Sequence, residues 1–224
     1  SLHDLAANGR DFVIGVQRAC FAQRFVEQPD DAVDVAGFAD LLRVGFDAQI
    51  VFRLRRGQRR AGEDPPASAR ARLHGAAQVV VLGDLWHSAQ GLTPALLDRV
   101  HAFAQRVPTA VVLGNHDRPI HPPGLALTVW PEAQPCGPLR ACHEPPERPA
   151  PTGFTLAGHL HPAVTLSSRA GDRMRRPCFW HRNHTLVLPA FGGLTGAYTL
   201  TEAQRRTSAV AVLGDDAVHW LCGG

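Results

Sequence analysis

Two short apolar runs on either side of a helical pattern constrain the fold of this chain more than any other feature. The runs are residues 78–82 (QVVVL) and 109–113 (TAVVL), and continuous β-branched runs are typical of strands buried on both faces. Between them, Thr93-Pro94 is a helix-start signal, and apolar residues recur at helical spacing up to Pro108. A strand–helix–strand unit predicts parallel strands joined by a right-handed crossover.

Both strands end in glycine followed by a polar residue. Gly83-Asp84 follows the first strand, and Gly114-Asn115 follows the second. Because parallel strands end at the same edge of a sheet, and ligands bind at that edge in open α/β sheets, we expect Asp84 and Asn115 to lie close together.

The rest of the chain reads mostly as β-structure. Residues 119–151 are rich in proline and predict loop with short strands, whereas residues 153–157, 185–189 and 208–213 each predict a strand without helices between them. Residues 1–75 are harder to assign, although residues 12–16 form an apolar segment.

Composition limits the class of protein. A length of 224 residues with 45% hydrophobic residues fits one large domain or two small ones, and we expect a single domain over residues 1–224. No apolar run approaches the roughly 18 residues of a membrane span, and we expect neither a membrane association nor a signal peptide. The five cysteines include no CxxC pair, which argues against a zinc–thiolate site and favours the cytoplasm.

The net charge of +3 is compatible with a phosphate-rich partner without requiring one. Basic residues cluster in residues 53–60 (RLRRGQRR) and 173–176 (RMRR). Either run could contact a nucleic-acid backbone, or could simply be an exposed loop.

Four segments carry residues suited to a hydrolytic metal site. The first is GDLWH, residues 83–87, whose Asp84 could bridge two cations. The second is GNHD, residues 114–117, which offers an asparagine carbonyl and a histidine, His116, that could donate a proton while Asp117 holds it.

The other two segments supply imidazoles. They are His143-Glu144-Pro145 and Gly158-His159-Leu160-His161. On an extended backbone, His159 and His161 would point the same way and could serve neighbouring metals. A lone histidine is more often an ordinary polar residue than a ligand, so the argument depends on all four segments occurring in this order.

GDxxH, GNHD and GHxH in this order resemble the calcineurin-like metallophosphoesterase superfamily. The resemblance covers about residues 78–200. Four segments within it are similar to a smaller group of the superfamily, the bacterial metallophosphoesterases encoded beside an ATP-dependent DNA ligase and a DEXH-box helicase. These segments are residues 143–145, 158–164, 176–180 (RPCFW) and 188–196 (LPAFGGLTG). The resemblance implies an α/β (α+β sandwich) fold: two mixed β-sheets packed face to face and flanked by helices.

The resemblance also implies roles for the site residues. Asp84 would bridge two divalent metals, Asn115, His143 and His159 would complete the second metal, and His161 would reach the first. His116, oriented by Asp117, would assist the leaving oxygen. The nucleophile would be a metal-bridging hydroxide. The oxygen and imidazole ligands favour Mn²⁺, with iron or zinc as the other choices.

One motif of the family is incomplete. The family begins with a D-x-H pair, and the nearest match is Asp40-Leu41-Leu42, where leucine stands in place of the histidine. Asp40 is then a candidate ligand of the first metal. His3, His74 and His87 are the residues that could replace the missing histidine.

Three functions fit this pattern. The first is a phosphodiesterase or nuclease in DNA repair, with DNA as substrate and the ligase and helicase as partners, as the resemblance implies. The second is a small-molecule phosphatase or cyclic-nucleotide phosphodiesterase. The third is a catalytically impaired scaffold, which the missing histidine favours.

Overall fold

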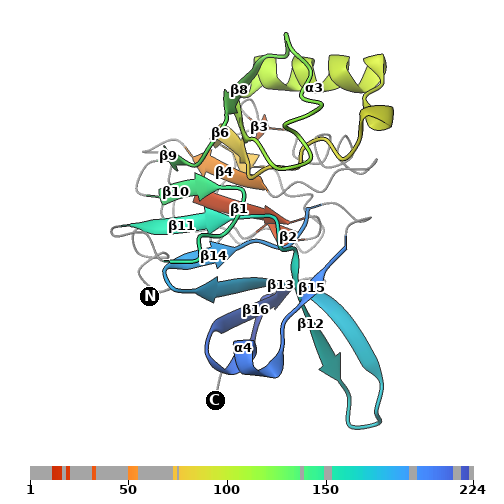
Figure 1. The fold of residues 1–224 in the computed structure, drawn as a ribbon, viewed down its shortest axis with the longest axis vertical. Helices are drawn as coiled ribbons and strands as arrows, with labels where there is room; N and C mark the ends of the chain where they lie inside the picture. The colour runs from red at the N-terminus through yellow and green to blue at the C-terminus, as the bar shows by residue number, and fades with distance from the viewer. Residues whose placement is uncertain are drawn as a thin grey trace.

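The computed structural model describes residues 12–16, 19–20, 32–33, 50–54, 73–74, 76–136, 139–148, 153–191, 196–213 and 218–221. These residues form two mixed β-sheets and a small pair of strands, with few helices (Figure 1). The pair consists of β3 (Ala32–Val33) and β5 (Leu73–His74), which run antiparallel.

The first sheet contains the two strands that the apolar runs predict. Its order is β2-β1-β4-β6-β7-β8, and these strands span Ala19–Cys20, Phe12–Val16, Ile50–Leu54, Ala76–Val81, Thr109–Val112 and Leu127–Trp130. β6, β7 and β8 pair in parallel, whereas β1, β2 and β4 add antiparallel pairs. The predicted parallel pairing is confirmed.

The second sheet is built from the C-terminal half of the chain. Its order is β15-β12-β13-β14-β11-β10-β9, over Tyr198–Thr199, Pro162–Ser167, Arg173–Arg182, Thr185–Val187, Phe154–Ala157, Leu139–Cys142 and Gln134–Cys136. β16 (Ala209–Leu213) pairs with β13, and β17 (Val218–Leu221) pairs with β16. β10, β11 and β14 are parallel to one another, so they too deliver their ends to one edge.

The two sheets share one hydrophobic core. Alternate residues of β6 and β7, such as Val80 and Val112, lie in the same buried cluster as Ala141, Leu156 and Leu186 of the second sheet. Side chains alternate between the faces of a strand, so each sheet turns one face toward the other. Burying these faces brings the ends of β6, β7, β10 and β11 together.

Helices are few in the described residues. The main one is α3 (Pro94–Arg106), which begins where Thr93 accepts a hydrogen bond from the Leu96 N–H, as the helix-start signal predicts. A 3₁₀ turn, η1, covers Ala89–Gly91, and α4 covers Glu202–Arg206. No helix of the described residues is long and apolar enough to cross a membrane.

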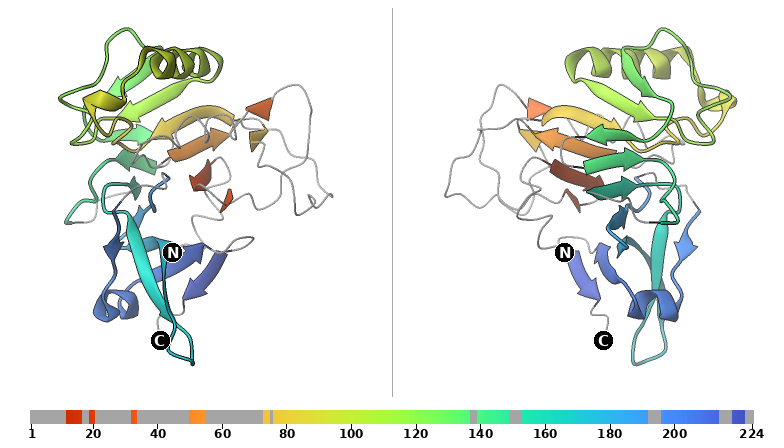
Figure 2. Two further views of the ribbon diagram at one scale, coloured as in Figure 1. Left: turned by 90° about the vertical axis from the view of Figure 1, so that its right-hand side faces the viewer. Right: turned by 60° about the vertical axis from the view of Figure 1, so that its left-hand side comes forward.

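The hairpin of β12 and β13 projects away from the body of the molecule, as the views in Figures 1 and 2 agree. The second half of β13, Cys178 to Trp180, is buried, and its first half continues outward beside β12. The hairpin is therefore an extension of a core strand.

We predict that Leu156→Ala lowers the free energy of unfolding by about 2–5 kcal/mol, because Leu156 is 2% exposed between the two sheets and its truncation leaves a cavity. Urea unfolding measures the change. Met174→Ala is the matched control, since Met174 is 52% exposed. A comparable loss in both variants would contradict a shared core at Leu156.

Candidate metal centre

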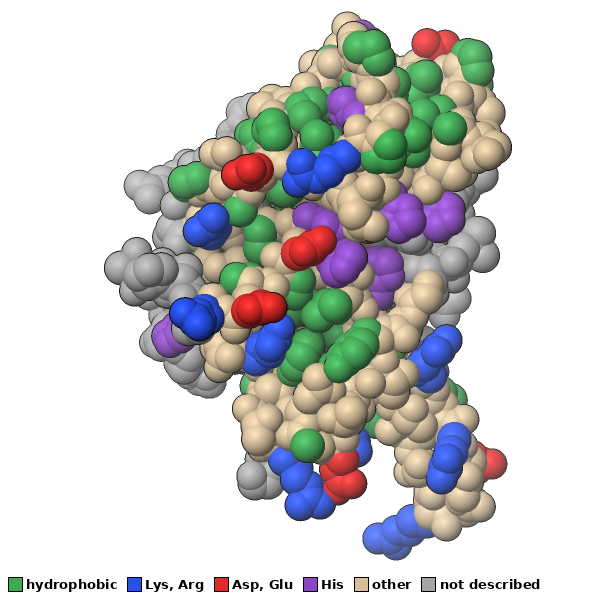
Figure 3. All heavy atoms as spheres, in the orientation of Figure 1, with side chains coloured by type: hydrophobic (Ala, Val, Ile, Leu, Met, Phe, Trp, Pro, Cys, Tyr) green, Lys and Arg blue, Asp and Glu red, His purple; other side chains and the backbone are tan. Residues whose placement is uncertain are grey.

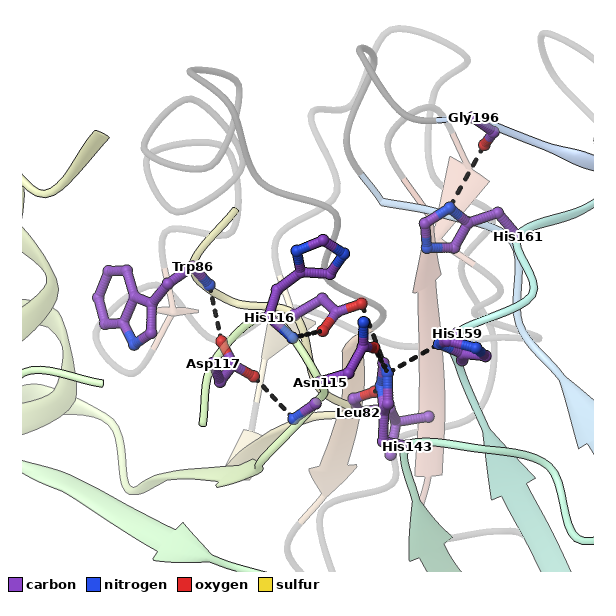
Figure 4. A network of polar contacts seen from close by, with 11 residues as sticks. Leu82, Trp86, Asn115, His116, Asp117, His143, His159, His161 and Gly196 are labelled. Carbon is purple, nitrogen blue, oxygen red and sulfur yellow. Dashed lines mark hydrogen bonds and ion pairs between the residues drawn. The ribbon is translucent and has the colours of Figure 1, made fainter. Parts of the chain in front are cut away.

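Side chains from four strand ends converge at one edge of the sheets (Figure 4). Asp84 follows β6, Asn115 follows β7, His143 follows β10 and His159 follows β11. The expectation that Asp84 and Asn115 lie close together is confirmed through His143, which approaches both of them.

His143 is the centre of this arrangement. Its Nδ1 lies 2.9 Å from the carbonyl oxygen of Leu82, which can only accept, so Nδ1 donates its proton there. The lone pair of the neutral ring is then on Nε2. That atom lies 3.0 Å from Oδ1 of Asn115, 3.0 Å from Nδ1 of His159 and 3.4 Å from Oδ2 of Asp84.

The donor set fits a divalent cation. Ligand atoms of Asp84, His143 and His159 all lie within 4.8 Å of one another, and Asp84 and His143 are buried. Two ligand atoms about 2.1 Å from an ion and at right angles lie about 3.0 Å apart, which matches the distances around Nε2 of His143. A divalent cation among these donors would offset the repulsion between their electron pairs.

Among the described residues, no thiolate joins these ligands. Cys142 precedes His143, but its sulfur lies 3.5 Å from the carbonyl oxygen of Leu156 in the core. Burial raises the pKa of the Cys142 thiol to about 11, so the group stays protonated near neutral pH. The ligands are therefore oxygen and imidazole nitrogen, as the sequence predicts.

Two glycines permit this close packing. A Cβ on Gly83 would lie 2.1 Å from Nδ1 of His143, and a Cβ on Gly114 would lie 2.1 Å from Oδ1 of Asp84. Gly83 also has φ +88°, a region that side chains disfavour. The glycines before Asp84 and Asn115 thus let the loop of one strand contact the ligand of another.

Asp117 differs from the prediction, because its carboxylate does not orient the His116 ring. Oδ1 accepts from the N–H of Trp86 at 2.8 Å and Oδ2 from the N–H of Gly114 at 2.9 Å. Asp117 is 0% exposed, and burial raises the pKa of its carboxyl while the two backbone bonds oppose that rise. Its side chain points inward and joins the loops after β6 and β7.

His116 lies at the solvent side of the centre. Its backbone N–H donates to Oδ1 of Asp84 at 3.1 Å, and its ring stacks on His87 with centroids 5.5 Å apart. The His116 side chain is exposed and is not one of the clustered ligands. His87, one of the possible replacements for the missing histidine, therefore contacts the proposed acid.

The backbone at His159 and His161 is not extended, which corrects the sequence prediction. Their φ angles are +65° and +48°, and Leu160 N–H donates to the carbonyl of Gly158 across a three-residue turn. As a result the two rings diverge. His159 meets His143, whereas Nδ1 of His161 lies 3.3 Å from the carbonyl oxygen of Gly196, to which it donates (Figure 4).

Strain concentrates at the predicted ligands. Asp84, with φ +53°, shares the left-handed region with His159 and His161, and each such residue costs on the order of 1–3 kcal/mol. Among the described residues, the other non-glycine cases are Asn183 and His184, which form the two-residue turn between β13 and β14. Such outliers gather at functional sites.

The structure does not describe Asp40, Leu42 or His3, which the sequence analysis considered for the first metal. His74, the other possible replacement, is the last residue of β5.

Sequence reasoning missed two partners. The carbonyl of Gly196 accepts a hydrogen bond from His161, although the sequence of residues 188–196 contains no side chain that suggests a metal ligand. The Trp86 indole N–H donates to Nδ1 of His121 at 3.0 Å. Backbone carbonyls leave no signal in the sequence, and the distance in sequence between Trp86 and His121 hides their pairing.

Comparison with known proteins gives a match among solved structures. No protein-family model matches the chain, and neither does any curated protein. Among solved structures, the crystal structure of the Pseudomonas putida nuclease MPE is similar, with 32% sequence identity and a TM-score of 0.55 over 66% of this chain and 73% of that one. The chain belongs to the family of this nuclease. Membership supports a hydrolase fold with a candidate metal site.

We predict that Gly114→Ala disrupts the centre, since its Cβ would overlap the Asp84 carboxylate. The expected results are a lower unfolding temperature and weaker Mn²⁺ binding by calorimetry. Gly91→Ala is the control, because a Cβ there meets only Oγ of Ser88, at 4.0 Å, and Gly91 lies outside the centre. If both variants bind Mn²⁺ like the parent protein, the packing of Gly114 on Asp84 is not required.

We also predict that His121 makes stability depend on pH. Burial lowers the pKa of His121 below 6.5, with Asp117 partly opposing this. Below pH 6.5 the unfolded chain therefore takes up a proton that the folded chain resists, and the free energy of unfolding falls as the pH drops below that value. Above pH 6.5 this contribution to stability is fully present.

His121→Asn tests this assignment, since the asparagine carbonyl can still accept from Trp86 but does not titrate. Urea unfolding of both proteins about one pH unit above and about one unit below 6.5 gives the comparison. The variant should lose less stability between the two pH values. An equal loss in both proteins would remove His121 as the cause.

Proposed function

We propose that this chain is a metal-dependent phosphodiesterase of the calcineurin-like metallophosphoesterase type that acts as a nuclease. The observation that carries the proposal is the convergence of Asp84, Asn115 and His159 on the lone pair of His143. The family relationship to a nuclease supports the same reaction class.

The proposed centre takes two divalent cations. Asn115, His143 and His159 would hold the second, Asp84 would be shared by both, and Asp40 with His161 would hold the first. Mn²⁺ ranks first, with iron or zinc as alternatives. Bound there, the cations would polarise a phosphoryl oxygen and lower the pKa of water.

His116 is the proposed proton donor. It is exposed beside the ligands but separate from their cluster, so its ring could reach an oxygen of a bound phosphodiester. Its backbone bond to Asp84 fixes its distance from the centre. Asp117 supports both groups indirectly, by holding the loops that carry Asp84 and His116.

The biological setting is also a proposal. The resemblance to metallophosphoesterases encoded beside an ATP-dependent DNA ligase and a DEXH-box helicase supports DNA as substrate, those two proteins as partners, and a cytoplasmic role in DNA repair.

One set of assays tests the function. Purified protein with Mn²⁺ is offered a chromogenic bis-aryl phosphodiester, the matching monoester, and labelled single- and double-stranded DNA. Hydrolysis of the diester and DNA is the expected result. Hydrolysis of the monoester alone would favour a small-molecule phosphatase, and no hydrolysis with Mn²⁺ bound would favour a scaffold.

We predict that Asp84→Asn abolishes hydrolysis and weakens Mn²⁺ binding. The amide can still accept the hydrogen bond from His116 N–H, so the fold is kept while the charge that holds the cations is lost. His116→Ala should keep Mn²⁺ bound and slow turnover by about 10²–10⁴-fold. Calorimetry and steady-state rates separate the two effects. Loss of Mn²⁺ binding in the His116 variant would reverse the assigned roles.

A further inference from the structure

The hairpin of β12 and β13 carries a basic face that the proposed chemistry does not use. Cα partners in the hairpin include Thr165 with Arg175 and Ser167 with Arg173. Side chains that alternate along a strand place Arg173 and Arg175 on one face together with these hydroxyl residues. All four residues are exposed, and arginine with hydroxyl groups is the combination that contacts nucleic-acid phosphates.

The other face of the hairpin packs on the body of the protein through its apolar residues, and the half-buried Arg176 and the exposed Met174 lie on this same face. Val164 is buried and Leu166 packs against the same cluster, which includes Cys178 and Trp180. The hairpin is thereby fixed by its inner face, and the regular register from Ala163–Pro177 to Ser167–Arg173 keeps the outer face in place. The arginines project from a strand whose other half is buried in the core.

Little negative charge opposes these arginines. Within the described hairpin the acidic residue is Asp172, whose carboxylate accepts from the Ser168 hydroxyl at 3.0 Å in the turn. Among the described residues, no ion pair joins Arg173 or Arg175 to a carboxylate. Figure 3 shows basic side chains along the projecting hairpin, on the same face of the molecule as the histidines of the centre.

The hairpin starts at the metal centre. β12 begins at Pro162, directly after His161. At about 3.3 Å per residue, Arg175 (opposite Thr165) lies on the order of 13 Å from His161 along the strand, and Arg173 (opposite Ser167) about 20 Å. One strand of duplex DNA carries one phosphate per about 3.4 Å of helix axis, so this reach measured along the axis corresponds to roughly four to six nucleotides.

We propose that the outer face of this hairpin binds the backbone of the nucleic acid several nucleotides away from the cleaved bond, and that efficient cleavage therefore needs a strand that extends along it. Arg173 and Arg175 bind phosphates, with Thr165 and Ser167 beside them. They are binding residues and take no part in the chemistry. This inference rests on the proposed phosphodiesterase function and adds a substrate-length requirement to it.

Binding to metal-free protein gives the first test. Arg173→Gln/Arg175→Gln should reduce the slope of log affinity against log salt by about 1.4 for single-stranded DNA or about 1.8 for duplex DNA, as expected for two lost phosphate contacts. Fluorescence anisotropy with a labelled oligonucleotide of about 20 nucleotides, several times the reach of the hairpin, measures the slope. Comparing single-stranded with duplex oligonucleotides identifies the form that is bound.

Matched variants make this test specific. Arg99→Gln/Arg106→Gln removes the same charge from exposed positions of α3, at the other end of the molecule (Figure 1), and should leave the slope nearly unchanged. Arg173→Lys/Arg175→Lys keeps the charge and should restore most of it. An unchanged slope in the glutamine variant, or an equal loss in the α3 variant, overturns the proposal.

Hydrolysis with Mn²⁺ gives the second test. The Arg173/Arg175 glutamine variant should raise KM roughly tenfold for the long oligonucleotide, and should leave cleavage of a dinucleotide and of the bis-aryl diester unchanged. Equal loss on the diester overturns the proposal, because it shows a disturbed centre. A parent protein that binds DNA with a hairpin-dependent slope but hydrolyses nothing supports the hairpin assignment and overturns the proposed hydrolysis.

Discussion

The hydrogen bond from Nδ1 of His143 to the carbonyl of Leu82 holds the candidate centre together. It joins the end of β10 in the second sheet to the end of β6 in the first, so it ties the two sheets at the edge where the ligands lie. It also sets the tautomer, which turns the Nε2 lone pair toward Asp84, Asn115 and His159. The bond exists because Gly83 has no side chain, since a Cβ there would overlap the imidazole.

Much of the fold is readable from the sequence because burial leaves a local signal. β6, α3 and β7 follow from apolar runs and from the Thr93-Pro94 helix start, and β11, β14 and β16 follow in the same way. The prediction that no helix lies between these later strands is wrong, because α4 lies between β14 and β16 and begins with a capping box at Thr201 and Gln204. The pairing of β12 with β13, and its projection as a hairpin, depends on contacts between distant segments. Local periodicity contains no information about those contacts.

For the candidate site, the sequence likewise predicts the residues but not the backbone geometry. Residue types and their order predict which side chains are candidate ligands, and four of them converge on His143 or include it. Backbone geometry is what sequence reasoning misjudged. His159 and His161 lie in a turn with positive φ, so their rings diverge, and Asp117 binds backbone N–H groups instead of the neighbouring ring. Adjacent residues in a tight loop point apart, and only the three-dimensional packing decides where each goes.

In the proposed function, the turn at His159–His161 joins the metal centre and the nucleic-acid-binding hairpin in one segment. Its strained backbone turns His159 inward to His143 and His161 toward Gly196, and the chain then leaves directly as β12. Tyr198 N–H donates to the carbonyl of His161 at 3.1 Å, and β15 pairs with the base of β12, which fixes the direction of departure. In this proposal, a turn that carries ligands and continues directly as a basic hairpin sets the distance between the centre and the face that binds the nucleic-acid backbone. A flexible linker at this place would leave that distance undefined, and no substrate-length requirement would arise.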